Sequence, residues 1–103
     1  IKNFIRGILK KNPDSDVSLF RSGNINFSIL TDADSGSGFI MVRSEDISIS
    51  INKPKSSALN THKGRIIDIA PARIGMEITV DIGIELTALI TNKSLLKLSL
   101  KAI

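Results

Sequence analysis

The fold of this chain is decided by residues 57–98, which read SALNTHKGRIIDIAPARIGMEITVDIGIELTALITNKSLLKL. Aliphatic and β-branched residues gather there in three short runs, and glycine or proline separates them, as in β-strands joined by turns. The strands that we expect are residues 65–70, 76–81 and 86–91. After them, Ser94 precedes leucines at positions 95, 96 and 98, a pattern that fits one short helical turn.

The first half of the chain has the same organisation. The expected strands are residues 4–9, 17–20, 25–29, 39–42 and 47–51. Gly7 interrupts the first strand, which predicts a bulge or the close approach of another backbone. Residues 39–42 are all apolar and therefore predict a strand that is buried on both faces.

Repeated short strands with glycine and proline turns predict an all-β protein of small oligonucleotide-binding-fold-like β-barrels, because closure removes exposed sheet edges. One short helical turn is expected near the C-terminus. The polar segment 52–56 contains Pro54 and indicates a linker, so we expect two β units, residues 1–52 and 53–103. The chain begins with Ile1 rather than Met, and we expect it to be part of a longer protein.

Composition and motifs exclude several functions. The chain has no cysteine and one histidine, which excludes thiolate chemistry and a histidine-built metal centre. Residues 31–38, TDADSGSG, offer carboxylates without the glutamate and spacing of an EF-hand, so we expect a surface connection rather than a metal site. The acidic residues stand in turns or on polar strand faces, and no nucleophile, zinc or phosphate-loop motif occurs. We therefore expect no enzymatic activity in this segment.

The formal charge of +4 raises the question of a polyanionic partner. Lysine and arginine are spread along the chain, and tryptophan and tyrosine are absent. The four phenylalanines lie in alternating apolar runs and are expected to pack in the core rather than to stack on bases. They are Phe4, Phe20, Phe27 and Phe39. Nucleic acid is therefore not the expected partner, and no apolar run approaches the length needed to span a bilayer.

Small hydroxyl and amide side chains stand at the expected strand ends of the second half. They are Ser57, Asn60, Thr61, Thr91 and Ser94. Such neutral donors suit a tetrahedral oxyanion, whose oxygens accept several hydrogen bonds. The same residue types also serve as turn and capping residues, and the pattern leaves both interpretations open.

The order of the motifs resembles a known family. Ser57-Ala58-Leu59-Asn60, Gly64, Asp81-Ile82-Gly83, the alternating run 86–91 and Thr91-x-x-Ser94 resemble the TOBE domain. The likeness is to its molbindin-type version at the C-terminus of molybdate or tungstate importer ATPases. Residues 41–50, MVRSEDISIS, are similar to the V-R-P-E-D-I segment that follows the nucleotide-binding domain of such ATPases, with Ser44 in place of proline. Together these matches span most of the chain.

The resemblance implies a regulatory domain at the C-terminus of an ABC transporter ATP-binding subunit, peripheral to the cytoplasmic face of the cell membrane. Its partners would be a second copy of the subunit, the upstream ATPase domain that binds ATP, and the membrane permease. The domain would sense molybdate or tungstate at the subunit interface and so inhibit import. Carried over by position, the oxyanion-binding residues are Ser57, Asn60, Lys63, Thr91 and Ser94.

Two departures from the family keep alternatives open. Leu59 stands where the family has arginine, and the family's last strand, with its K-A-[ST] triplet, would lie beyond Ile103. The first alternative, which Leu59 favours, is the same domain in an importer of sugars, polyamines or iron, where it serves dimerisation only. The second is an oligonucleotide-binding module, which the barrel pattern and the basic charge favour.

Overall fold

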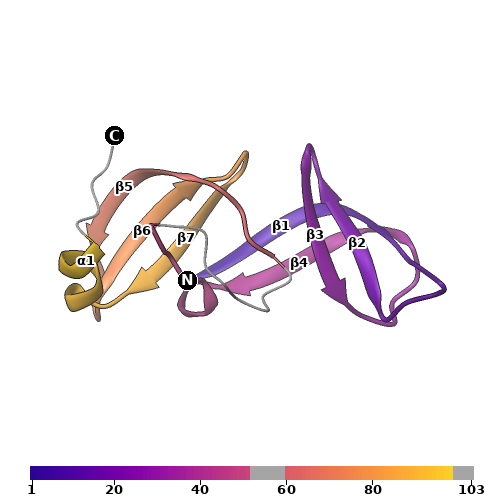
Figure 1. Ribbon diagram of the computed structural model, residues 1–103, viewed down its shortest axis with the longest axis horizontal. Helices are drawn as coiled ribbons and strands as arrows, with labels where there is room; N and C mark the ends of the chain where they lie inside the picture. Colours follow the sequence, from indigo (N-terminus) through magenta and orange to yellow (C-terminus); the bar gives the residue numbers. More distant parts are fainter. Residues whose placement is uncertain (52–59, 99–103) are drawn as a thin grey trace. The chain divides into compact units, whose positions relative to one another are not determined.

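The computed structural model describes residues 1–51 and 60–98, and these form seven strands and a short C-terminal helix. Figure 1 shows their arrangement along the chain. The elements are β1 (Lys2–Lys10), β2 (Val17–Ser22), β3 (Ile25–Leu30), β4 (Gly36–Arg43), the 3₁₀ turn η1 (Ser44–Asp46), β5 (Arg65–Pro71), β6 (Met76–Asp81), β7 (Glu85–Ile90) and α1 (Asn92–Leu98). The predicted all-β class with one short helix is confirmed.

The strands form two antiparallel sheets, with the orders β3-β2-β1-β4 and β5-β6-β7. A closed barrel, as predicted, is not seen among the strands that the structure describes. Both sheets are open, because each has two edge strands that do not pair with one another. Three strands in particular are too few to tilt and wrap into a closed ladder.

The described residues divide into two compact units that are discontinuous in sequence. The four-strand unit holds residues 4–41 with residues 60 and 61. The three-strand unit holds residues 1–3, 42–51 and 62–98. Residues 1–3 and 42–51, at the two ends of the expected first half, therefore group with the second sheet. The expected linker, 52–56, lies outside the described residues, and the expected division at residue 52 stays a prediction.

Two expectations for the middle of the chain were wrong. Residues 47–50 alternate between half-buried and exposed positions, but Ile51 is exposed as well, and residues 47–51 belong to neither sheet. Strand β4 is not buried on both faces: the side chains of Phe39 and Met41 are 61% and 48% exposed. The reason is that β4 is an edge strand of an open sheet with one covered face.

The core of the four-strand unit contains Ile5, Phe20 and Phe27, all of them buried. Phe20 and Phe27 are cross-strand partners on β2 and β3, with ring centroids 6.5 Å apart and ring planes tilted by 54°. Gly7 lies beneath this pair on β1. A Cβ atom there would stand 2.3 Å from the Arg21 carbonyl oxygen and 2.6 Å from the Phe20 ring. The predicted close backbone approach at Gly7 is confirmed.

We expect Gly7→Ala to lower the free energy of unfolding by about 2–3 kcal/mol, because the new methyl must displace backbone and a buried ring in a packed core. Urea denaturation followed by circular dichroism measures this. Gly38→Ala is the matched control, since a Cβ atom at Gly38 meets nothing within 4 Å. Equal stability of the two variants would contradict the close packing at Gly7.

The core of the three-strand unit contains Ile78 and Ala88, which are fully buried cross-strand partners on β6 and β7. The expected turns are confirmed: Gly75 and Gly83 take positive φ angles of 77° and 110° between the strands. Gly64 precedes β5 and admits no side chain, because a Cβ atom would lie 2.5 Å from Val80. The glycines of the motif series thus have steric roles in this sheet.

A single amide side chain joins the N-terminus to this sheet. The Asn3 Nδ2 atom donates to the carbonyl oxygens of Val42 and Thr87, at 3.1 and 2.8 Å. The Asn3 Oδ1 atom accepts from the Thr87 N–H at 2.8 Å. Thr87 lies on edge strand β7, and the amide therefore bonds it as a neighbouring strand would.

We expect Asn3→Asp to lower the stability of the protein by about 2–3 kcal/mol, because the donor to two partly buried carbonyl oxygens becomes an acceptor. Part of the loss should be recovered at acid pH, where protonation of the new carboxyl restores one donor. Thermal unfolding at neutral and acid pH measures both effects. Asn26→Asp, on the exposed surface of β3, is the control and should change little. An Asn3→Asp protein as stable as the control would contradict this role for the amide.

Candidate functional site

Two of the predicted site residues meet at the start of helix α1. The Thr91 Oγ1 atom accepts a hydrogen bond from the Ser94 N–H at 3.0 Å, as an N-cap residue does. The Thr91 hydroxyl also lies 2.9 Å from the Ser94 hydroxyl and donates to it. Thr91 thus starts the helix, while the Ser94 hydroxyl keeps its own proton for another acceptor. The pair therefore offers one donor to an anion, the Ser94 hydroxyl.

The side-chain amide of Asn60 is hydrogen-bonded to the backbone of Ser28. Its Oδ1 atom accepts from the Ser28 N–H at 2.7 Å, and its Nδ2 atom donates to the Ser28 carbonyl oxygen at 2.9 Å. Ser28 belongs to edge strand β3 of the four-strand unit, and Asn60 bonds it in the way that Asn3 bonds Thr87. The Asn60 amide is therefore occupied with the backbone of a strand.

The other two predicted site residues are Lys63 and Ser57. Lys63 is exposed and belongs to the three-strand unit together with Thr91 and Ser94. Ser57 lies outside the described residues. The structure brings Thr91 and Ser94 into contact, and it engages Asn60 with the other unit. The oxyanion site remains a prediction for Ser57, Asn60, Lys63, Thr91 and Ser94.

The stretch 41–50 contributes a rigid corner to the three-strand unit. The Arg43 Nε atom lies 3.1 Å from a carboxylate oxygen of Asp46, and this hydrogen-bonded ion pair raises the pKa of the Arg43 guanidinium. The Ser44 N–H donates to the Ile1 carbonyl oxygen at 2.9 Å. Proline has no N–H group, so the serine that departs from the family pattern makes a bond that the family's usual residue cannot make.

We expect Ser44→Pro to destabilise the protein by about 1–3 kcal/mol, because it removes a bonded N–H and leaves the Ile1 carbonyl oxygen without it. Ser44→Ala keeps the N–H and is the control. Differential scanning calorimetry of the two variants makes the comparison. A Ser44→Pro protein at least as stable as Ser44→Ala would show that the bond to Ile1 contributes nothing.

Each unit has a surface hollow. The hollow of the four-strand unit has a volume of about 440 Å³ and is lined by Lys10, Lys11, Asn12, Pro13, Val17, Ser18, Leu19 and Ser28. The hollow of the three-strand unit has a volume of about 560 Å³ and is lined by Ile1, Ser44, Glu45, Ala72, Arg73, Ile74, Glu77 and Leu89. Neither contains a predicted oxyanion residue. Within residues 1–51 and 60–98, no three acidic or histidine side chains gather as a metal site would require.

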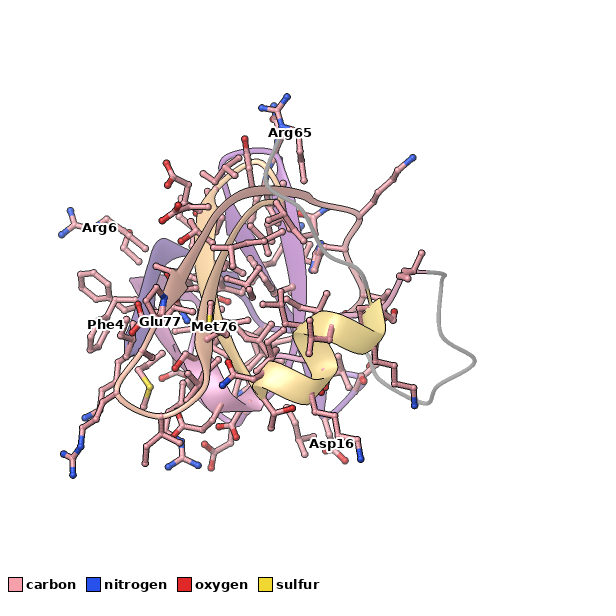
Figure 2. The ribbon with its side chains drawn as sticks, turned by 90° about the vertical axis from the view of Figure 1, so that its left-hand side faces the viewer. Phe4, Arg6, Asp16, Arg65, Met76 and Glu77 are labelled. Carbon is pink, nitrogen blue, oxygen red and sulfur yellow. The ribbon has the colours of Figure 1, made fainter. Side chains whose placement is uncertain are left out.

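An exposed apolar surface of the four-strand unit was missed by the sequence reasoning. Phe4 and Phe39, which were expected in the core, are 66% and 61% exposed, so that prediction was wrong for them and correct for Phe20 and Phe27. The Arg6 guanidinium lies over the Phe39 ring, 4.9 Å from its centroid. Figure 2 shows Phe4 and Arg6 projecting to the same side. The alternation along residues 2–10 indicates that Phe4 is exposed, because Phe4 lies on the same strand face as the charged Lys2, Arg6 and Lys10.

No protein-family model matches this chain, and no curated protein is similar to it at a significant level. The resemblance to the TOBE domain rests on the order of the motifs. Among the described residues, no helix has the length and apolar character to cross a membrane.

Proposed function

We propose that this chain is an accessory domain of the TOBE type in the ATP-binding subunit of an ABC importer. The observation that carries the proposal is that residues 42–51 and 62–98, which hold most of the motif positions, contribute to one compact unit. Residues 52–61 separate them in sequence, and Asn60, which is also part of the motif series, belongs to the other unit. The corner η1 packs on strand β7, so the V-R-x-E-D-I stretch and the L-T-A-L-I-T stretch are neighbours.

Local geometry supports the same proposal at the level of single residues. Gly64 and Gly83 are both part of the motif series. A Cβ atom at Gly64 would clash with Val80, and Gly83 takes a positive φ angle. Thr91 and Ser94 form a capping pair at the start of a helix.

In the oxyanion-sensing version of the proposal, Lys63, Thr91 and Ser94 contribute to a molybdate or tungstate site that a second copy of the chain completes. The cation of Lys63 balances the charge of the dianion, and the Ser94 hydroxyl supplies a donor. The engaged amide of Asn60 favours the other version, in which the domain serves dimerisation only. The partners in either version are a second subunit, the ATPase domain that binds ATP, and the permease.

A thermal-shift titration of the full-length protein with molybdate, tungstate and sulfate separates the two versions. In the sensing version, the first two oxyanions raise the melting temperature by about 5 °C or more at saturation, because they bind only the folded state. Lys63→Gln should weaken the apparent affinity for both oxyanions at least tenfold, so the melting temperature should rise less at a given oxyanion concentration. Lys97→Gln, on the exposed surface of α1, is the matched control and should leave the affinity unchanged.

The absence of a shift with all three oxyanions would refute the sensing version. A protein that then dimerises without any anion, measured by sedimentation, would support the dimerisation version. A full-length protein that neither dimerises nor responds to oxyanions would contradict the TOBE proposal as a whole.

A further inference from the structure

The outward side of the four-strand sheet carries a large apolar surface within one unit. Strand alternation places Phe4 and Ile8 of β1 on this side, and the Arg6–Phe39 contact adds Phe39 and Met41 of β4. The register of β1 with β2, in which Lys10 faces Leu19, adds Leu19. We refer to Phe4, Ile8, Leu19, Phe39 and Met41 as the outer apolar group. All five side chains are between 42% and 66% exposed.

Single exposed apolar residues are ordinary, but five on one sheet face within 38 residues of chain form a contiguous surface of the kind that marks an interaction site. The composition points the same way. Phenylalanine, methionine and arginine are enriched at the centre of protein–protein interfaces, whereas aspartate, glutamate and lysine are depleted there.

The charge of this face has one sign. Arg6 and Arg21 share it, and Lys10 follows at the end of β1 beside the hollow that Lys11 also lines. Arg21 is held by a hydrogen bond from its Nε atom to the Gly23 carbonyl oxygen at 2.9 Å, and Arg6 by the Phe39 ring. The four aspartates of residues 4–41 all lie in the connections 11–16 and 31–35. Apolar and cationic side chains therefore alternate on this face, because Arg6 lies between Phe4 and Ile8 on β1 and Arg21 is the cross-strand partner of Ile8.

These observations distinguish between occupants. A second copy in a two-fold arrangement would bring the same cations together, because such an interface is self-complementary. A single-stranded nucleic acid would use aromatic rings, yet three members of the outer apolar group are aliphatic and Arg6 already covers one face of Phe39. A protein surface that carries apolar and acidic side chains next to one another matches both the apolar area and the charge.

We infer that the outer face of the four-strand sheet is a docking surface for a different protein, whose contact surface carries apolar and acidic side chains next to one another. The outer apolar group contacts the apolar side chains of that partner, and Arg6, Lys10 and Arg21 pair with its acidic side chains. This inference does not depend on the proposed function.

The test uses the protein and two fluorescein-labelled peptides of about 12 residues. In both, serine occupies every second position; the positions between hold leucine and glutamate in turn in the Glu/Leu peptide, and leucine and lysine in turn in the Lys/Leu peptide, so that the leucines and the charged residues share one face of a strand. Fluorescence anisotropy measures the affinities. The Glu/Leu peptide should bind at least tenfold more tightly than the Lys/Leu peptide, and its binding should weaken as salt rises. The double variant Phe4→Ser/Phe39→Ser should lose at least tenfold in affinity.

Ile74→Ser is the matched control for that variant, because Ile74 is 76% exposed in the other unit, and it should leave binding unchanged. A charge-reversed double variant, Arg6→Glu/Arg21→Glu, should exchange the preference and bind the Lys/Leu peptide more tightly. This second variant keeps all five apolar side chains, so the test does not depend on the folding of the serine variant.

Four outcomes would overturn the inference. They are equal binding of the two peptides, no binding of the Glu/Leu peptide, tighter binding of a single-stranded oligothymidine in a manner that Phe4→Ser/Phe39→Ser abolishes, and self-association of the protein that the same variant abolishes. The third outcome would assign the face to nucleic acid, and the fourth to a second copy of the chain.

Discussion

The three-strand unit depends on the amide side chain of Asn3. An amide carries one acceptor and a pair of donors in the arrangement of a peptide group, so it can satisfy both backbone groups of one residue on an edge strand. Asn3 does this for Thr87 and also bonds Val42. Without this amide, the backbone N–H and carbonyl oxygen of Thr87 and the carbonyl oxygen of Val42 would lose these hydrogen bonds.

The same device occurs in the four-strand unit, where Asn60 bonds both backbone groups of Ser28 on edge strand β3. Open sheets expose unpaired edges that invite association, and a carboxamide placed on the edge interrupts that template. Asn60 therefore has a structural role that a carried-over function would not suggest. The identity of a motif residue alone does not distinguish an anion ligand from an edge-blocking amide.

The sequence predicted all seven strands to within three residues at each end, the turns at Gly75 and Gly83, and the helical segment after Thr91, but it also predicted a strand at residues 47–51 that does not form. These features are local, because alternation, glycine placement and capping act within a few residues. It failed where the outcome depended on what lies on the other side of a strand. The apolar run 39–42 reads as doubly buried, but only the neighbours of β4 decide whether its second face is covered.

By itself, then, the sequence determined the class of the fold, the positions of its strands and turns, and the motif order that suggests an importer accessory domain. Tertiary structure alone decided three further properties: that residues 1–3 and 42–51 join the second sheet, that the Asn60 amide is engaged, and that Phe39 is exposed beside Arg6. The physical reason is the same for all three. Hydrogen bonds and burial between residues far apart in the chain depend on which strands become neighbours, and no local pattern specifies that.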